Sequence, residues 1–194
     1  MRLNVRPTRS RGSALRRRLH LPLALAIAAT GTLATTTAVA DEDSPKKVQV
    51  WTKSADGYIV AVARVPFTAD TILNFMADGA RAHRLAPTTV KAQRLGGDGT
   101  CERLRLTVRG LFSPFKVDTR RCRTANGYHE TMISSDDFEA YDVIWEIEPV
   151  GDDSMISFRA KNVLSISIPE GLQIRESKKV MSKTVKNLAK ALRG

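Results

Sequence analysis

The stretch CERLRLTVRGLFSPFKVDTRRC, residues 101–122, predicts a β-hairpin and decides the fold. Apolar and polar residues alternate through 104–108 and again through 115–119. Alternation with a period of two is typical of strands that bury one face. When Cys101 is placed opposite Cys122, the apolar residues of both halves share one face and most of the charged residues share the other. Register and pattern therefore agree on one pairing.

The same register places Cys101 and Cys122 side by side, where a cross-strand disulfide could form. They are the only two cysteines of the chain. A single pair in an oxidising compartment is expected to be a disulfide. Because His83 and His129 are isolated in the sequence, the pair has no partners for a zinc site. We therefore expect a disulfide, no metal and no cofactor.

The tip of this hairpin carries two large apolar residues, Leu111 and Phe112. Apolar side chains at a hairpin tip are exposed to solvent unless another surface covers them. The sequence leaves three interpretations open: packing against a neighbouring element, a lid over a cavity, or a point of contact with a membrane.

The rest of the chain predicts further strands and two short helices. A turn signal at 54–57 separates two alternating runs. Thr68 is placed to cap a helix with Asp70 in its first turn, and a second short helix is expected at 80–85. The other strands are expected at 48–51, 58–65, 89–95, 100–109, 115–124, 128–134, 140–150, 154–160 and 163–168. Their short connections predict antiparallel neighbours.

A long helix closes the chain. Ser167 and Glu170 fit a capping box, with Pro169 in the first turn. Its apolar face is expected to hold Met181, Thr184, Val185, Leu188 and Leu192. Its other positions carry Arg175, Lys178, Lys179, Lys183, Lys186 and Lys190. These cations form either a solvated face or a surface attracted to anionic lipid headgroups.

Residues 1–40 differ from the rest of the chain. They contain seven arginines and no acidic residue, followed by the apolar run 19–29 and an end at Ala38-Val39-Ala40. A basic start, a short apolar run and a small-x-small end are the three parts of a secretory signal peptide. We expect cleavage after Ala40, with Ala38 and Ala40 read by the peptidase. Residues 41–47 are then a mobile lead-in to a domain at 48–194, exported to the periplasm or beyond. The Sec route is favoured over the twin-arginine route.

Cleavage would change the charge of the protein. The chain has 31 Lys and Arg against 20 Asp and Glu, a net charge of +11. Without the seven arginines of residues 1–40, 24 basic residues would face 20 acidic ones, a net charge of +4. Nucleic-acid binding needs a concentrated basic face, so we expect no nucleic-acid partner.

The order of elements resembles the START-like helix-grip superfamily, also called SRPBCC, which includes polyketide cyclase-like, coenzyme Q-binding and lipid-transfer proteins. The resemblance covers nearly all of residues 46–194. It is carried by the stretches DGYIV (56–60), PFTADTIL (66–73), AD (77–78), DFEAYDVIWEI (137–147) and the helix at 177–192. It implies an α+β fold in which a curved antiparallel sheet wraps around a long C-terminal helix, with two short helices after the first strand. It also implies an apolar cavity between sheet and helix.

Nine apolar residues are the candidates to line that cavity, although for any single one of them plain core is the favoured interpretation. The candidate set is Phe75, Met76, Leu106, Met132, Tyr141, Trp145, Phe158, Met181 and Val185. Tyr141 and Trp145 lie on one face of a strand, and each has a polar atom besides its apolar ring. They are the strongest members of the set.

The family resemblance implies a carrier of a small hydrophobic molecule: a lipid, a quinone or a polyketide-like compound. Two alternatives stay open, because a fold does not fix a function. One is a cofactor-independent enzyme of the polyketide cyclase or dehydrase type, with Tyr141 or His129 as its acid or base. The other is a protein-interaction module of the cell envelope. No hydrolase motif is present, and Glu130 points away from His129 on the same strand. The oligomeric state stays open.

Overall fold

The computed structural model describes residues 48–110 and 113–194. The expected signal peptide, its cleavage residues Ala38 and Ala40, the lead-in 41–47 and the hairpin tip Leu111-Phe112 lie outside the described residues. None of the helices in the described ranges is long and apolar enough to cross a membrane.

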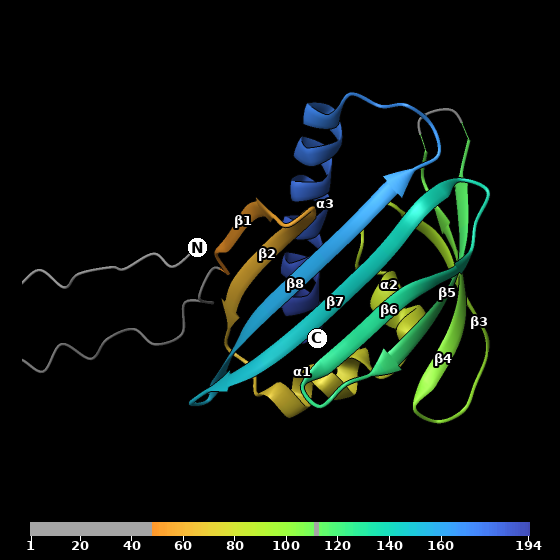
Figure 1. The fold of residues 1–194 in the computed structure, drawn as a ribbon. Coiled ribbons are helices and arrows are strands. Elements are labelled where there is room, and N and C mark those ends of the chain that lie inside the picture. Colours follow the sequence, from red (N-terminus) through yellow and green to blue (C-terminus); the bar gives the residue numbers. More distant parts are fainter. Residues whose placement is uncertain (1–47, 111–112) are drawn as a thin grey trace, which may run out of the picture. The chain divides into compact units, whose positions relative to one another are not determined.

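Eight antiparallel strands form one sheet in the order β1-β2-β8-β7-β6-β5-β4-β3. Figure 1 shows the sheet curling from β1 and β2, beside helix α3, through the long strands β7 and β8 to β3–β5. The strands are β1 (Val50–Ala55), β2 (Tyr58–Val65), β3 (Thr89–Gly97), β4 (Cys101–Val108), β5 (Phe115–Arg123), β6 (Gly127–Ser134), β7 (Phe138–Val150) and β8 (Asp153–Leu164). The helices are α1 (Ala69–Met76), α2 (Gly79–His83) and α3 (Glu170–Ala191). This is the expected helix-grip fold, with α1 and α2 following the first hairpin.

The hairpin at 101–122 has the register expected from its sequence. Cys101 pairs with Cys122, and the pairing continues without a break to Val108 and Phe115. The two cysteines form a disulfide. The first hairpin is set by its turn, where Asp56 and Gly57 both have positive φ, at 53° and 76°. Two such residues make the type I′ turn that fits the twist of paired strands.

Both short helices start at a side-chain cap: the cap at Thr68 was expected, and the cap at Asp78 was not. The Thr68 side chain accepts a hydrogen bond from the Thr71 amide at the start of α1. Asp78 accepts one from the Arg81 amide at the start of α2. These caps satisfy amide groups that have no partner inside a helix. Helix α1 ends at Met76, and the Asp78 cap allows α2 to begin at Gly79.

Two expectations about the end of the chain are wrong. The capping box at Ser167 does not form: Pro169, with φ −53° and ψ 125°, is the cap of α3 and makes no side-chain hydrogen bond. The extended backbone at Pro169 moves the helix start past Ser167. The strands expected at 154–160 and 163–168 are one strand, β8, because its pairing with β7 runs through to Leu164.

Helix α3 is buried over only half its length. Its C-terminal half contributes Met181, Thr184, Val185, Leu188 and Ala189 to the core. No residue from Glu170 to Val180 is buried. Gln173 holds this outer half to the sheet by donating to the Asn162 carbonyl of β8, at 2.6 Å. The sheet beneath residues 170–180 is therefore less tightly covered than the rest.

Candidate functional site

The nine residues expected to line a cavity come together on the inner face of the sheet. Eight of them are buried and Met132 is partly buried against the same hydrophobic cluster. They come from α1, β4, β6, β7, β8 and α3, which are spread along the whole domain sequence. Whether they enclose a ligand stays a prediction.

The members of the set differ in how much of their surface stays exposed. Tyr141 keeps 9% of its surface exposed, and Trp145 and Phe158 keep 8% each. Leu106 and Val185 keep 1% and 0%. Phe75 of α1 also keeps 9% and Met132 of β6 is only partly buried, so the residual exposure of the set is spread over α1, β6, β7 and β8.

A β-bulge aligns the aromatic side chains of β7. Phe138 pairs with Leu164 but Ala140 pairs with Val163, so Glu139 is an extra residue in β7. The bulge turns both Phe138 and Tyr141 inward, although they are three positions apart. Their rings meet edge to face with centroids 5.9 Å apart.

Farther along β7, Trp145 lies opposite Phe158 of β8, and the two rings stack with centroids 3.9 Å apart. Together with the inward pair at the bulge, they make a continuous apolar surface along these two strands. We call this set the aromatic strip: Phe138, Tyr141, Trp145 and Phe158.

Two polar atoms of the aromatic strip have no partner. Within the described residues, neither the Tyr141 hydroxyl nor the Trp145 Nε1 makes a hydrogen bond. Among the described residues, Arg159 Nε is the polar side-chain atom that is closed to water and has no hydrogen-bond partner. Both strip atoms therefore keep surface that a water molecule can touch. By contrast, the Tyr128 hydroxyl on neighbouring β6 donates to the Leu73 carbonyl at 3.1 Å.

The inner face of β4, β5 and β6 carries a row of charged residues instead. Arg121 lies between Glu102 and Glu130 in the strand register. All three side chains are buried, at 9%, 3% and 2% exposure for Glu102, Arg121 and Glu130. We call Glu102, Arg121 and Glu130 the charged row. Buried charges are costly unless paired, and every member of the row is paired.

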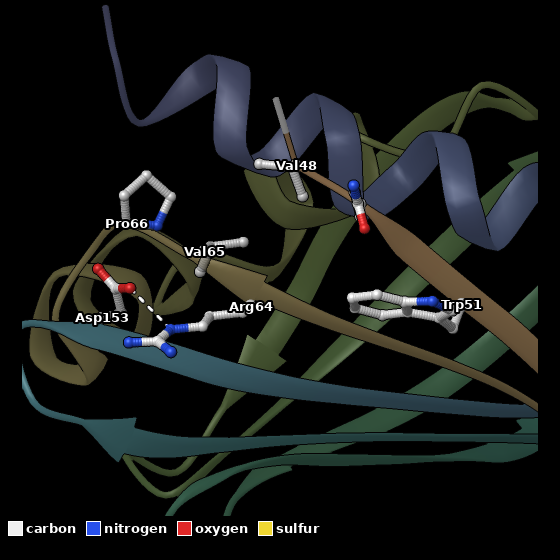
Figure 2. A pocket seen from close by; sticks show the side chains of 7 residues that line it. Val48, Trp51, Arg64, Val65, Pro66 and Asp153 are labelled. Carbon is white, nitrogen blue, oxygen red and sulfur yellow. Dashed lines mark hydrogen bonds and ion pairs between the residues drawn. The ribbon is translucent and has the colours of Figure 1, made fainter. Parts of the chain in front are cut away.

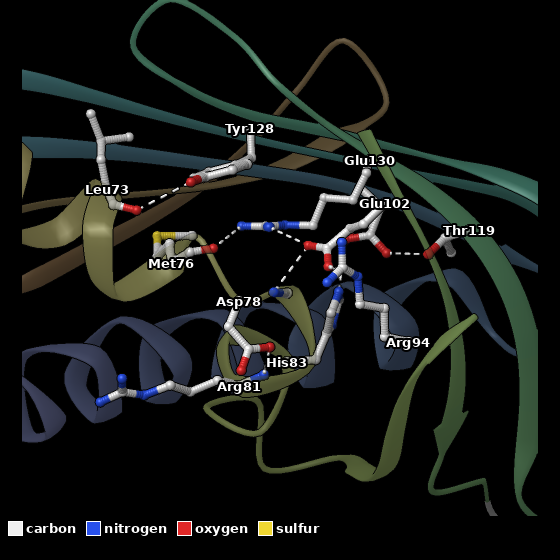
Figure 3. A network of polar contacts seen from close by, with 12 residues as sticks. Leu73, Met76, Asp78, Arg81, His83, Arg94, Glu102, Thr119, Tyr128 and Glu130 are labelled. Atoms are coloured by element: carbon white, nitrogen blue, oxygen red, sulfur yellow. Dashed lines mark hydrogen bonds and ion pairs between the residues drawn. The ribbon is translucent and has the colours of Figure 1, made fainter. Parts of the chain in front are cut away.

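The charged row binds the two short helices, as Figure 3 shows. Arg121 donates to Glu102 at 2.8 Å and to the Met76 carbonyl at the end of α1 at 2.7 Å. Glu102 accepts from the Gly79 amide at the start of α2, at 3.0 Å. A Cβ at Gly79 would collide with Glu102 Oε1, so glycine permits this close approach. The guanidinium also stacks 3.7 Å from the Tyr128 ring centroid.

Glu130 at the other end of the row is held from two sides. His83 Nε2 of α2 lies 2.7 Å from one carboxylate oxygen, and Thr119 donates to the other at 2.5 Å. Burial on its own raises the pKa of Glu130, but His83, Thr119 and Arg121 together hold that pKa below its usual value. Glu130 is therefore a carboxylate whose two oxygens are both occupied.

Sequence reasoning missed this network. The predicted register, with Cys101 opposite Cys122, also places Glu102 opposite Arg121, as the structure does, but His83 was treated as an isolated residue. The available signal was the presence of charged residues at inward positions of the hairpin, where only paired charges are stable. The partners on α1 and α2 are distant in sequence and could not be assigned.

The two candidate catalytic residues lie on opposite faces of the sheet. Tyr141 faces inward, where burial and the nearby Glu130 carboxylate raise its pKa well above the usual value, against an opposing effect of Arg121. His129 faces outward and lies 3.1 Å from Asp142, with 43% of its side chain exposed. His129 and Glu130 point in opposite directions, as expected. The structure brings no second acid or base to Tyr141 with a free oxygen or nitrogen among the described residues.

A pocket of about 200 Å³ lies elsewhere, at the ends of β1 and β2 beside the β7–β8 turn (Figure 2). The Arg64–Asp153 ion pair, at 2.7 Å, forms part of its wall, and Trp51 is 58% exposed. The pocket is lined by Val48, Gln49, Trp51, Arg64, Val65, Pro66 and Asp153. None of the nine expected residues lines it, and sequence reasoning did not foresee it.

Residues 48–110 and 113–194 hold no group of three or more His, Cys, Asp or Glu side chains placed to bind a metal ion.

Comparison with known proteins places the fold. No protein-family model and no curated protein matches the chain. Solved structures do match. A STAR-related lipid transfer protein from Xanthomonas axonopodis is 14% identical, with a TM-score of 0.64 over 78% of this chain and 96% of that one. A START superfamily protein from Mycobacterium smegmatis is 21% identical, with a TM-score of 0.55 over 70% of this chain and 93% of that one.

An aromatase/cyclase, Zhui from Streptomyces sp. R1128, is 15% identical, with a TM-score of 0.55 over 70% of this chain and 90% of that one. The class that these likenesses define is that of the START-like helix-grip fold. At these identities the likeness establishes the fold of the domain.

Proposed function

We propose that the chain is an exported binding or carrier protein for a small hydrophobic molecule, held between the aromatic strip and the outer half of α3. One observation carries the proposal. The Tyr141 hydroxyl and the Trp145 Nε1 are unpaired, reachable by water and surrounded by apolar rings. Ligand sites are typically apolar surfaces with a few polar groups that fix orientation.

The physical basis of binding would be burial of apolar surface, at roughly 25 cal/mol per Å². A ligand seated along β7 and β8 would cover ring surface that the outer half of α3 leaves open. Solved structures with this fold include proteins named for lipid transfer, which supports the same use here.

Export is supported by two features. The arginine-rich start, apolar run and Ala-Val-Ala end of residues 1–40 have the order of a secretory signal. The Cys101–Cys122 disulfide is the kind of bond that persists in oxidising compartments. The proposed mature domain starts at Asp41 and works in the periplasm or outside the cell.

Native mass spectrometry tests the proposal. The full chain is expressed in a bacterial host and recovered from the periplasm. We expect a mass that begins at Asp41, lacks two hydrogens because of the disulfide, and includes an added mass that disappears on denaturation. Recovery from the cytoplasm with Met1 intact would overturn export. Protein that carries no added mass and also takes up no fluorescent hydrophobic probe would overturn the carrier.

A cofactor-independent enzyme of the polyketide cyclase type is the second candidate, favoured by the likeness to an aromatase/cyclase. Tyr141 would be its inward-facing acid. The raised pKa of Tyr141 keeps the phenol protonated at neutral pH, so it suits hydrogen-bond donation better than proton abstraction. If the bound molecule is chemically altered during incubation with the protein, so that its mass changes, the result would favour the enzyme over the carrier.

We also propose that the carrier meets anionic membranes through α3. Lys183, Lys186 and Lys190 are exposed on one face of the helix, in line with Arg175 and Lys179. Leu172, at the start of this face, is 39% exposed, and Ile166 just before the helix is 46% exposed. Glu176 pairs with Arg175 and Lys179, so the proposal rests on Lys183, Lys186 and Lys190. Exposed lysines on a helix with exposed apolar side chains near its start match a bilayer with negative headgroups.

Co-sedimentation with vesicles tests the membrane contact. Wild type should bind phosphatidylglycerol vesicles and not phosphatidylcholine vesicles, and added salt should weaken binding. The triple variant K183E/K186E/K190E should lose binding. The control K91E/K116E/K161E changes three exposed lysines elsewhere and should retain most of it. An equal loss of vesicle binding in both variants would show that binding depends only on net charge, and it would overturn the assignment to α3.

A further inference from the structure

The outer face of the β4–β5 hairpin carries two arginines that face each other. Residues of β4 alternate between buried and exposed, so Arg103 points away from the core while Glu102 and Leu104 point into it. Arg120 of β5 is also exposed and lies directly opposite Arg103. Like charges directly opposite each other in a sheet are destabilising, so this pair works against the stability of the hairpin.

The outward pairs on either side of the two arginines contain no such conflict. On one side, Cys101 and Cys122 are joined by the disulfide. On the other side, Arg105 donates to both carboxylate oxygens of Asp118, at 2.7 Å each. These two bonds lie next to the arginine pair in the strand register. The backbone that carries the two arginines is therefore fixed by its neighbours.

The described chain supplies no acidic group that neutralises both arginines. Arg103 makes no hydrogen bond or ion pair among the described residues. Arg120 has Asp98, at 3.9 Å, and both of these side chains are more than half exposed. The other carboxylate oxygen of Asp98 accepts from the Thr100 and Cys101 amides, so Asp98 holds the β3–β4 turn. The space between the two guanidinium groups has no bridging carboxylate.

The strands on both sides leave room around the pair. A β-bulge in β3 makes Leu95 an extra residue, so Gly96 rather than Leu95 lies opposite Arg103. A Cβ placed on Gly96 would meet no atom within 4 Å. On the other side, Thr131 of β6 lies opposite Arg120. One row across the sheet thus presents an open position, two guanidinium groups and a hydroxyl.

We propose that Arg103 and Arg120 bind the phosphoryl group of a phosphate monoester between their guanidinium groups, with the Thr131 hydroxyl as a further donor. Side chains directly opposite in antiparallel strands start from Cβ atoms roughly 5 Å apart, so two forked guanidinium groups can converge on one anion. A dianion there replaces repulsion by charge-assisted hydrogen bonds. Because the core and α3 lie on the other face of the sheet, this site is separate from the proposed carrier function.

Titration calorimetry with inorganic phosphate tests the site. At pH 8, where most phosphate is dianionic, wild type should bind it, and R103Q/R120Q should bind it about tenfold or more weakly because charge-assisted hydrogen bonds are lost. The control R109Q/R123Q removes two exposed arginines from the ends of the same hairpin and should bind as wild type does. Equal weakening in both variants would show that only net charge matters and would overturn the site.

Thermal unfolding gives an independent measurement. Without phosphate, R103Q/R120Q should melt above wild type because the repulsion is gone. Phosphate at ten times its Kd, compared with chloride at equal ionic strength, should raise the Tm of wild type by about 3 °C and leave that of the variant unchanged. An equal rise in both proteins would be a general effect of phosphate on protein surfaces and would overturn the site.

A last titration identifies the source of the phosphoryl group. Glycerol 3-phosphate carries a phosphate monoester in a soluble molecule, and phosphatidic acid vesicles carry one at a bilayer surface. Binding of glycerol 3-phosphate that is lost in R103Q/R120Q assigns the site to a soluble ligand. Vesicle binding that is lost in the same variant, without binding of glycerol 3-phosphate, assigns it to a lipid headgroup. Binding of neither overturns the assignment to a phosphate monoester.

Discussion

The charged row and the aromatic strip lie on neighbouring strands of one inner face, yet they treat polar atoms in opposite ways. Every charged group of Glu102, Arg121 and Glu130 has a partner, and these partners hold α1 and α2 to the sheet. The strip leaves the Tyr141 hydroxyl and the Trp145 N–H without one. Unpaired buried polar groups are costly, so the two regions differ in how much their polar atoms contribute to the stability of the fold.

Arg121→Met should produce the largest loss of stability. It leaves Glu102 and Glu130 buried without their common cation and removes a donor from the Met76 carbonyl. Breaking a buried ion pair from one side costs about 3–5 kcal/mol, measured as the free energy of unfolding in urea. The matched control is Arg105→Met, because Arg105 bonds Asp118 on the same hairpin but on the exposed face. Equal losses in both variants would contradict the distinction between row and surface.

Removing the disulfide should come next. The Cys101–Cys122 bond lies one position from Glu102 and Arg121 and links residues 21 apart in sequence. The double variant C101S/C122S should lose about 3 kcal/mol of unfolding free energy. Uptake of a fluorescent hydrophobic probe should persist wherever the variant is folded, because the bond lies beside the charged row and not beside the strip. Loss of probe uptake by the folded variant would show that the two regions depend on each other.

Glu130→Gln should lower the free energy of unfolding by an amount that depends on pH. Its pKa lies below the usual 4.5 in the folded protein. The ionised form therefore adds stability above about pH 4.5, and this is lost as the pH falls through the lower folded value. At pH 7 we expect the variant to lose about 2 kcal/mol. Urea unfolding across pH 7 to 3 should show the gap to wild type closing, whereas a constant gap would assign the loss to packing.

Whether a feature of the fold could be predicted from the sequence depends on how far apart in the chain its interacting residues lie. The 101–122 hairpin, the Thr68 cap and the buried face of α3 depend on residues close in sequence, and all three were predicted correctly. Ser167 failed because a capping pattern does not fix the backbone at Pro169. His83 was missed because its partner, Glu130, is 47 residues away.

The placement of Tyr141 and Trp145 on one face also followed from the pattern of β7. That their polar atoms lack partners did not follow, because a sequence gives the direction of a side chain and not what surrounds it. Tyr128 has a partner because α1 offers it the Leu73 carbonyl, and no described residue offers one to Tyr141.

The smallest predicted effect is the most discriminating test of the comparison. Tyr128→Phe removes a hydroxyl that donates to the Leu73 carbonyl of α1, so it should cost about 1 kcal/mol of unfolding free energy. Tyr141→Phe removes a hydroxyl of equal size that bonds nothing in the described chain, so it should leave the free energy of unfolding unchanged or slightly higher. Urea unfolding of both variants, together with their affinities for a fluorescent hydrophobic probe, compares stability with binding. We expect Tyr128→Phe to lose stability and keep affinity, and Tyr141→Phe to keep stability and lose affinity. Equal destabilisation of both would mean that the Tyr141 hydroxyl already has a hydrogen-bond partner in the folded protein. The aromatic strip would then be ordinary core, because its polar atom would contribute to stability without a ligand.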